Sequence, residues 1–560
     1  MANLFNSIRV RPPKLNRFNL SHDVKLTCSF GSLVPIMVQD CLPGDVFKNR
    51  CELLARFMPL KAPIMQEINV YTHFFFVPKR LLWDKWKEFI TGGEDGIDIP
   101  PYPKLMVSYA APSQFSSGSL ADYLGFPVVN TGQTVHPSWS NSDGNFIDAL
   151  PFRAYQLIYN EYYRDENVTK EIDIKKDISG IYENRSHMQL RKRAWRKDYF
   201  TSALPWAQRG DEVTLPLQGE APFKIAGEGN LDLSLGQFEQ LVASNGAAIQ
   251  SGNLAATPRS GSVGDIRDSK GNKLYVSNNS TPLSRVQISA EDIEHDLFSG
   301  VDLSKASAAT INELRRAIKA QEFLEVGARG GSRYIEQIYS YFGVRSSDAR
   351  LQRPQFIGGG KSPVVISDVL QTSQSTDTSA QATPAGHAVS VQNAHSFKFH
   401  CEEHGYIIGI MSIMPKASYQ QGMPRMFSKF DRLDYYWPQF AHLGEQEILN
   451  KELYIDYSKP ATSDENKGIE NTFGYSPRYS EYKFCYDTVH GNFRDNLAFW
   501  HMGRIFDSPP ALNSDFLTSM VGSVDRQFAV TDVEADPIWV QLHHNLKALR
   551  KMPKYGTPMF

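Results

Sequence analysis

The sequence lacks the features that define several common protein classes. It contains only five cysteines, an odd number, which favours reduced thiols over a disulfide framework. It has no run of about 18 consecutive apolar residues, so no membrane span is predicted, and residues 1–18 lack the apolar core of a signal peptide. The formal net charge is only −2, whereas a protein that neutralises nucleic acid by itself is strongly basic. We therefore expect a soluble cytoplasmic product that is not a main condenser of nucleic acid.

Catalytic and cofactor motifs are also missing. No Gly-x-Ser-x-Gly elbow occurs. The run GGGKS at 358–362 resembles a phosphate-binding loop, but Gln355 stands where that motif requires glycine, so we do not expect nucleotide binding. His400 and His404 in HCEEH would share a face on a helix, yet the surrounding residues read as strand, turn and strand, which favours an exposed turn over a metal site. No cofactor, metal or catalytic residue is predicted.

Aromatic residues are abundant, at 12% of the chain, which indicates extensive packed or interface surface. Apolar and polar residues alternate from Val24 to Phe30 and, more strongly, from Ile68 to Phe76, as in half-buried strands. Further strands are expected at Gly405–Met414, apolar on both faces, and at Tyr479–Asp487. The strands are scattered along the chain without regular βαβ alternation, a pattern that favours an antiparallel barrel with elaborated loops.

A few helices are expected between these strands. Apolar residues at helical spacing predict one through Leu82–Phe89, with Gly92 at its end. Another should span 151–164. Thr310 and Glu313 have the spacing of a capping box at the start of a helix over 310–325. A last helix should span 332–342 and stop at Gly343.

Three basic segments are candidates for contact with nucleic acid. The N-terminal segment, where Pro12-Pro13 blocks a helix, is expected to be an extended arm and carries Arg9, Arg11, Lys14 and Arg17. The segment 191–197, RKRAWRK, surrounds an aromatic ring with cations, as a single-strand clamp does; its candidate residues are Arg191, Lys192, Arg193 and Trp195. A salt-bridged helix face or a subunit contact is the alternative. The C-terminal tail carries Lys547, Arg550, Lys551 and Lys554 and has no acid beyond Asp536, so it could face nucleic acid or a neighbouring subunit.

Two segments are poor in core-forming residues. From Leu241 to Ala290 the only aromatic residue is Tyr275, and Gly, Ser, Asn and Ala dominate. Such a segment cannot build a large core of its own. The Ser/Thr-rich stretch Gln371–Gln392 is expected to be an exposed loop.

Seven blocks of this sequence, in the same order along the chain, resemble the major capsid protein of the Microviridae, small single-stranded DNA phages, and especially the gokushovirus branch. The two strongest are EINVYTHFFFVPKRLLWDKWKEFITGGEDG and YFGVRSSDARLQRPQFIGGG. The others lie at Asn16–Asp45, Leu150–Asn167, Lys197–Gly210, Phe473–Phe484 and Met552–Phe560. Together they cover about half of the chain, and residues 211–300 and 371–392 do not resemble the family.

The resemblance implies a mainly β protein: an eight-stranded antiparallel jelly-roll barrel with long loop insertions and a few short helices. It also implies a non-enzymatic capsid protein that self-assembles into a T=1 icosahedral shell around circular single-stranded DNA, in virions assembled in the bacterial cytoplasm. The implied partners are other copies of the chain, the genome through its backbone, a small basic DNA-binding protein of the virion and a host surface receptor.

We divide the chain accordingly into four parts: a basic arm (1–23), a first part of the jelly roll (24–210), a surface insertion that forms a capsid protrusion (211–300), and the remainder of the jelly roll with the C-terminal tail (301–560). The protrusion would lie near the threefold axes. A β-sandwich carbohydrate-active enzyme or glycan-binding protein remains the rival hypothesis, because sequence cannot pair carboxylates across space.

Overall fold

The computed structural model describes residues 14–106, 112–130, 133–136, 146–182, 185–211, 213–214, 310–370, 384–460, 462–464, 466–520, 525–529 and 536–555, and the backbone of short strands between 223 and 301. The chain divides into two compact units. One contains Met1–Gly210 and Phe323–Phe560, and the other contains Asp211–Glu322. None of the helices in the described ranges combines the length and hydropathy that crossing a bilayer requires.

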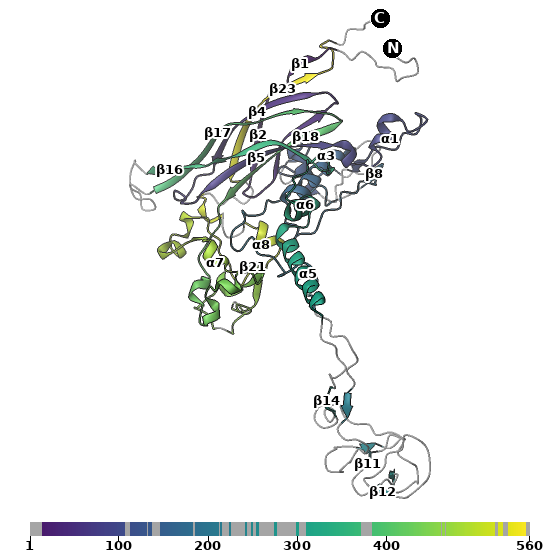
Figure 1. Cartoon of the computed structure of the whole chain (residues 1–560). Helices are drawn as coiled ribbons and strands as arrows, with labels where there is room; N and C mark the ends of the chain where they lie inside the picture. Colours follow the sequence, from purple (N-terminus) through teal and green to yellow (C-terminus); the bar gives the residue numbers. More distant parts are fainter. Residues whose placement is uncertain are drawn as a thin grey trace. The chain divides into compact units, whose positions relative to one another are not determined.

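The larger unit is built on a six-stranded antiparallel sheet, here called the first sheet (Figure 1). Its central strand is β23 (Ile538–Arg550), which pairs with β4 (Val46–Phe57) on one side. On its other side β23 pairs with both β1 (Asn16–Asn19) and β2 (His22–Cys28). Beyond β4 the sheet continues through β17 (Pro384–His400) to β16 (Val365–Leu370). The first and last strands, β1 and β23, are therefore neighbours in one sheet.

A four-stranded antiparallel sheet, the second sheet, packs against the first. Its order is β15 (Gln355–Pro363), β5 (Ile68–Pro78), β18 (Gly405–Pro415) and β3 (Val34–Cys41). The two sheets lie face to face and do not close into one continuous barrel in the described residues. A mainly β protein with antiparallel sheets is confirmed.

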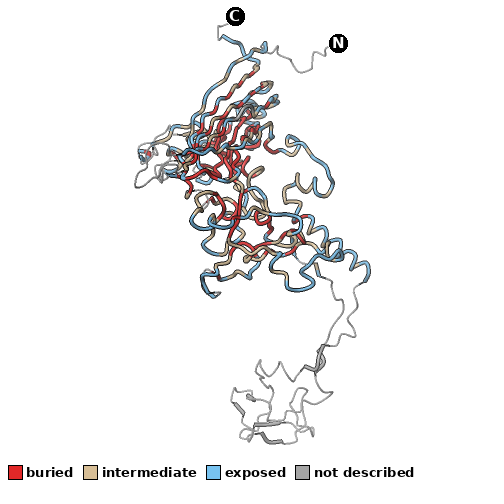
Figure 2. The backbone as a smooth tube through the Cα atoms, turned by 90° about the vertical axis from the view of Figure 1, so that its left-hand side faces the viewer, coloured by how far each residue is buried: buried red, intermediate tan, exposed pale blue. Residues whose placement is uncertain are grey.

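The main core lies between the two sheets. Alternate residues of β5 point into it, so the ring of Phe74 lies 4.9 Å from that of Phe397 on β17, and the ring of Phe76 lies 4.8 Å from that of Phe399. Cys51 and Leu542, from the first sheet, belong to the same buried cluster. Figure 2 shows this buried backbone in red along the strands. The alternation of residues along β5 therefore corresponds to a strand face that lies in the core between the two sheets.

The opposite face of the second sheet is also covered. Phe75 and Ile408 contribute to a second buried cluster with α3 (Leu150–Ile158), and α1 (Trp86–Thr91) adds Trp86. Because both of its faces are buried, β18 is apolar on both faces apart from Ser412, as the sequence predicted. The π-helical turn η4 (Tyr159–Tyr163) extends α3, and its Tyr162 ring lies 4.7 Å from Phe75.

Three consecutive glycines allow β15 to pass close to its neighbours. A Cβ on Gly358 would lie 2.8 Å from the carbonyl oxygen of Ser396, and one on Gly359 would lie 2.3 Å from that of Thr72. At Gly360 it would lie 2.5 Å from the His395 ring. The GGGKS run is therefore part of a strand, where glycine permits close approach of backbones, and it does not form a phosphate-binding loop.

Most of the predicted helices are confirmed. Helix α5 (Ile311–Gly330) begins with the expected capping box, in which Thr310 Oγ1 accepts from the Glu313 N–H at 3.2 Å. Helix α6 (Tyr334–Phe342) ends at Gly343, with φ +66°. Helix α3 and η4 fill the range expected for residues 151–164. Helix α1 begins later than expected, at Trp86, after the 3-10 turn Lys79–Leu81.

Three expectations about strands and loops were wrong. Residues 16–19 form the paired strand β1 and are not part of an extended arm. The predicted strand 479–487 contains the short helix α7 (Ser480–Lys483), because Tyr479 adopts a left-handed backbone with φ +62°. Residues 384–392 belong to β17 instead of a loop, whereas 371–383 lie outside the described residues.

Smaller elements fill the long connections after β5 and β18. They are α2 (Leu120–Tyr123), α8 (Ser514–Thr518), the sheet of β6 (Lys104–Met106), β7 (Phe146–Asp148) and β8 (Ile181–Tyr182), the pair of β19 (Ser418–Tyr419) with β22 (Asp487–Thr488), and the pair of β20 (Glu445–Leu449) with β21 (Thr472–Pro477). In the second unit, taken by itself, β9 (Phe223–Ile225) pairs with β14 (Phe298–Val301), β10 (Leu241–Val242) with β11 (Ala248–Ile249), and β12 (Leu254–Ala256) with β13 (Leu274–Val276).

Candidate nucleic-acid interface

The basic segment 191–197 is extended and lies against the backbone of the larger unit. The Leu33 N–H donates to the carbonyl of Arg191 at 2.9 Å, and the Arg193 N–H donates to that of Gly31 at 2.7 Å. Further along, the Trp195 N–H donates to the carbonyl of Leu517 at 2.8 Å. The segment is therefore held by main-chain hydrogen bonds, and the alternative of a helix face does not apply.

Two of its arginines turn inward. The Arg191 guanidinium donates to Gln156 Oε1 at 2.9 Å and to the Ser186 carbonyl at 2.6 Å. Arg193 donates to Ser412 Oγ at 2.9 Å. Burial lowers the pKa of both guanidinium groups, and neither forms an ion pair with a carboxylate in the described parts of the chain. Two cations are thus kept among neutral partners, which is costly unless an anion approaches.

Trp195 is 2% exposed. Its indole N–H donates to the Ser519 carbonyl at 3.0 Å, and the Arg504 guanidinium lies 5.3 Å from the ring. The ring is therefore part of the core, whereas Lys192 and Arg196 are exposed on either side of it. Contact of this segment with nucleic acid remains a prediction, in which the exposed cations are the groups available to phosphates.

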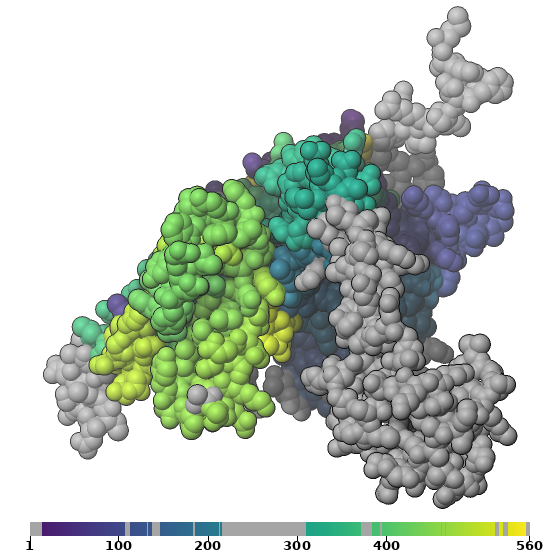
Figure 3. Space-filling view, turned by 60° about the horizontal axis from the view of Figure 1, so that its bottom comes forward, coloured from purple at the N-terminus to yellow at the C-terminus, as the bar shows by residue number. Residues whose placement is uncertain are grey.

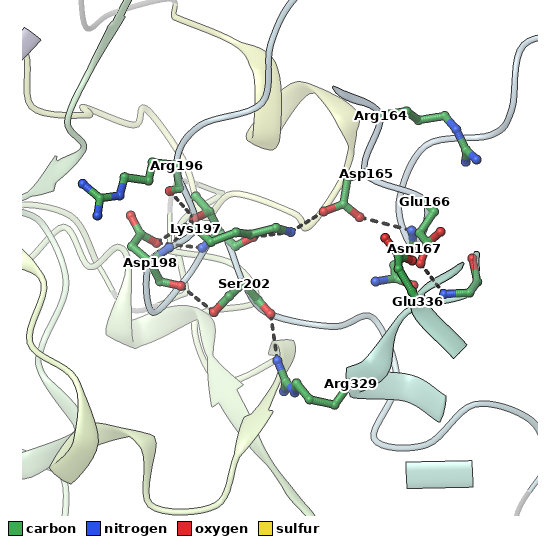
Figure 4. A network of polar contacts seen from close by, with 12 residues as sticks. Arg164, Asp165, Glu166, Asn167, Arg196, Lys197, Asp198, Ser202, Arg329 and Glu336 are labelled. Atoms are coloured by element: carbon green, nitrogen blue, oxygen red, sulfur yellow. Dashed lines mark hydrogen bonds and ion pairs between the residues drawn. The ribbon is translucent and has the colours of Figure 1, made fainter. Parts of the chain in front are cut away.

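Lys197, the last cation of the segment, belongs to a polar network (Figure 4). Its ammonium group forms an ion pair with Asp165 and donates to the Thr201 carbonyl at 3.1 Å. Nearby, the Ser202 hydroxyl donates to the carbonyl of Asp198 at 2.5 Å, and Arg329 donates to the Ser202 carbonyl at 3.1 Å. The network connects the end of the basic segment to the loop that follows η4, through Asp165, and to the end of α5, through Arg329.

The structure brings two other basic segments together. Because β1 pairs with β23, Asn16 lies opposite Arg550, and its side-chain amide donates to the Met552 carbonyl at 2.8 Å. The exposed cations near this sheet edge therefore come from both ends of the sequence: Lys14, Arg17, Lys551 and Lys554. Arg550 itself pairs with buried Asp45 at 3.1 Å. Arg9 and Arg11 lie outside the described residues.

The cysteines and the HCEEH turn have ordinary structural roles. All five cysteines are free, and four of them are buried, as expected for reduced thiols. His400 ends β17 and Gly405 begins β18, which confirms the strand, turn and strand. The Glu403 carboxylate in this turn accepts from Arg80 Nε at 2.6 Å and from its Nη2 at 3.0 Å.

An exposed apolar segment at 426–443, here called the aromatic patch, was not predicted from the sequence. Phe430 is 88% exposed and Phe427 64%. Figure 3 shows this part of the chain, in green, on the surface that faces the viewer. The exposed large hydrophobic residues of the patch are Met426, Phe427, Phe430, Leu433, Tyr435, Tyr436, Trp437 and Leu443. In the sequence, the patch is indicated by the run MFSKFDRLDYYWPQF, in which aromatic residues are frequent but follow neither helical nor strand spacing. An apolar surface of this kind marks an interaction site.

Known proteins resemble this chain over nearly its whole length. The family described as "Capsid protein (F protein)" matches residues 10–560. Capsid protein VP1 of Chlamydia phage 1 is 35% identical, with 100% of this chain and 98% of the relative covered. Capsid protein VP1 of Bdellovibrio phage phiMH2K is 34% identical, with 97% and 95% covered, and that of Spiroplasma virus 4 is 29% identical, with the same coverage.

These matches confirm the resemblance to microvirus capsid proteins on which the sequence analysis rested, and they place the protein among the components of a virion. They extend well beyond the seven blocks and include the segments that did not look familiar. The family match spans more than half of the chain, and two relatives exceed 30% identity over almost all of it. The chain therefore belongs to the family of phage capsid proteins described as F proteins.

Proposed function

We propose that this protein is the structural subunit of a small T=1 icosahedral shell that encloses circular single-stranded DNA, and that it is not an enzyme. Its partners are other copies of itself, the genome and a small basic DNA-binding protein, and the shell assembles in the bacterial cytoplasm. Membership of the capsid family supports this proposal. The net charge of −2 supports a separate basic protein, because this chain cannot neutralise a genome alone.

The aromatic patch is the observation that carries the self-assembly proposal. Its residues are exposed in the isolated chain, although the same unit buries two large apolar cores. Phe, Tyr, Trp and Met are enriched in the buried centres of interfaces between subunits. We infer that neighbouring copies cover the patch in the shell. The aromatic segments at 74–89 and 151–163, by contrast, bury most of their rings within the chain.

We also infer that the two sheets constitute an eight-stranded jelly roll. The support is strand order: β2, β23, β4 and β17 are neighbours in the first sheet, and β3, β18, β5 and β15 in the second. Strands that follow one another along the chain mostly lie in opposite sheets, as in a double Greek key. In this view β1 and β16 extend the first sheet, and residues 79–354 and 416–537 are insertions between core strands.

Electron microscopy of the expressed protein tests the main proposal. We expect closed particles of uniform size, and Phe430→Asp should abolish them. A protein that remains monomeric under every condition and turns over glycans would refute the capsid function and support the rival carbohydrate-active enzyme. Glycan binding without turnover, together with normal shells, would leave the proposal intact.

We propose that the N-terminal arm meets DNA phosphates without reading bases. Because residues 16–19 form β1, deletion of residues 1–13 removes Arg9 and Arg11 without removing a strand. The deletion should lower the DNA content of particles, measured by the absorbance ratio at 260 and 280 nm. Unchanged DNA content and unchanged particle stability would show that the arm has no role in packaging.

We propose further that residues 211–300 form the protrusion of the shell near the threefold axes and carry contact with a host receptor. The support is compositional: the segment is poor in aromatics, and loops on a rigid scaffold commonly carry recognition. Several copies around one axis would add their weak contacts through avidity. Replacing Leu241–Ala290 with a short Gly/Ser linker should leave assembly intact and impair attachment to the host. Failure to assemble would instead assign the segment to subunit contacts.

A further inference from the structure

A pocket of about 670 Å³ lies between the second sheet and the basic segment 191–197. The sheet supplies Tyr71 and His73 from β5 and Phe356 and Lys361 from β15, and the basic segment supplies Arg193 and Arg196. The pocket thus joins the lysine of GGGKS to the cations of RKRAWRK, two runs that are far apart in the sequence. Its size is in the range of small-molecule and nucleotide sites.

The aromatic wall of this pocket is preassembled. The rings of His73 and Tyr163 are stacked, with centroids 5.9 Å apart, and the Tyr163 hydroxyl lies 2.8 Å from His73 Nδ1. Phe356 meets His73 edge-on at 5.8 Å and is 48% exposed. Burial, together with the charge of Arg193, lowers the pKa of His73 to about 4. The histidine is therefore a neutral ring at neutral pH and serves as part of an aromatic surface.

The pocket is also electropositive. None of the described residues that line it carries a carboxylate, and Lys197 in its lining forms an ion pair with Asp165. A hydrogen bond from Asn69, with the charges of Lys361, Lys416 and Arg196, lowers the pKa of Glu67, which is not among the residues that line the pocket. The Arg193 guanidinium lies 4.1 Å from the Tyr71 ring centre and 5.8 Å from that of Tyr163, and its hydrogen-bond partner is the neutral Ser412.

The pocket combines aromatic faces with three cations, Arg193, Arg196 and Lys361, that form no salt bridge among the described residues, and this combination suits one class of ligand. A nucleotide offers a base that stacks on rings and a phosphate that meets cations, and single-strand binding proteins use this combination without reading sequence. A free phosphate would not use the rings, and an apolar ligand would leave the cations unpaired. The two features together favour a unit of single-stranded nucleic acid.

We propose that this pocket binds a nucleotide of the packaged single-stranded DNA, with the base against Phe356 and the His73–Tyr163 pair and the phosphate near Arg196 and Lys361. The inference rests on the proposed function as a shell around such a genome. It adds a defined site, on the second sheet, to the non-specific contacts of the N-terminal arm.

Fluorescence anisotropy of a fluorescein-labelled ten-nucleotide oligo(dT), titrated with the full-length protein, tests the site. Phe356→Ala should weaken binding at least about fivefold, because base stacking contributes that much or more. The matched control is Phe484→Ala, whose ring is 45% exposed and lies outside the pocket. Lys361→Gln should lower the slope of log affinity against log salt concentration by about one, which corresponds to one released ion. Lys87 is an exposed lysine on α1, and Lys87→Gln should leave the affinity and its salt dependence unchanged.

Competition separates the ligand chemistries. Deoxyadenosine 5′-monophosphate should displace the oligonucleotide at lower concentration than inorganic phosphate at equal ionic strength, and Phe356→Ala should remove this difference. The site would be refuted if Phe356→Ala and Phe484→Ala bound the oligonucleotide with equal affinity and Lys361→Gln bound it as the wild type does. Particles seen by microscopy would in that case still support the capsid function. If Phe356→Ala stopped particle formation without changing oligonucleotide affinity, the pocket would hold a neighbouring subunit, and the proposal would be refuted.

Discussion

His544 should make the stability of the subunit depend on pH. The residue lies on β23 and is fully buried. Its Nε2 donates to the Ile36 carbonyl at 3.1 Å, and its Nδ1 accepts from the Asn49 amide at 3.4 Å. This arrangement uses both nitrogens of a neutral ring. Burial, followed by the nearby charges of His22 and His543, lowers the pKa of His544 to about 4, and a free histidine has a pKa of about 6.5.

The sign of the effect follows from where the proton binds. Between pH 6.5 and 4 the unfolded chain takes up a proton on this histidine and the folded chain does not. The stabilisation is therefore present above pH 6.5 and is lost as the pH falls towards 4. For pKa values of about 4 and 6.5, the loss between pH 7 and pH 5 is about 2 kcal/mol. His544→Gln, which cannot titrate, should lose about 2 kcal/mol less over that interval.

Urea unfolding of the unassembled subunit at pH 7 and pH 5, followed by tryptophan fluorescence, measures this difference. His442→Gln is the control, because His442 is exposed and its substitution should leave the pH dependence as in the wild type. The reasoning would be refuted if wild type and His544→Gln lost the same free energy of unfolding between the two pH values. A greater loss in the variant would also contradict it.

Three further substitutions test the core, the close strand approach and the exposed surface. Phe74→Ala should lower the free energy of unfolding by about 3–5 kcal/mol, and a double-mutant cycle with Phe397→Ala should give a coupling of about 0.5–1.5 kcal/mol; strict additivity would contradict the inter-sheet contact. Gly359→Ala should destabilise by about 1–3 kcal/mol or more, because the new Cβ would lie 2.3 Å from the Thr72 carbonyl, and an unchanged urea midpoint would contradict that approach. Phe430→Asp should abolish particles in sedimentation while the urea midpoint of the subunit stays within about 0.5 kcal/mol of the wild type; normal particles would contradict a role for the patch in assembly.

The sequence predicted individual elements better than their pairing. Alternation identified β5 because one of its faces lines the inter-sheet core, and helical spacing with caps identified α5 and α6. Pairing could not be predicted, because β23 reaches β4 and β1 across almost the whole chain. The strand expected at 479–487 was wrong because Tyr479 adopts a left-handed backbone, and its ring packs locally, 5.0 Å from that of Tyr436.

The candidate site was predicted only in part. The cations of 191–197 were visible in the sequence, but the inward position of Arg193 was not, because the rings that cover it come from β5 and η4, which are distant along the chain. Lys361 was considered only as part of a phosphate-binding loop. Its place beside Arg196 depends on the register of β15 against β5. Contacts between distant segments therefore decide which of these residues share a pocket, and the motif patterns alone did not reveal this.

The central place of β23 has a consequence for synthesis of the subunit. Ribosomes make β1, β2 and β4 first, yet these strands do not pair with each other; they pair with β23, whose residues are translated after nearly all others. Contacts at such long sequence separation make folding slow. Until β23 arrives, β4 lacks one neighbour and exposes an edge that can pair with other nascent chains. Incomplete chains would therefore be open to aggregation or proteolysis, and the supply of assembly-competent subunits would depend on chains that have been translated through β23.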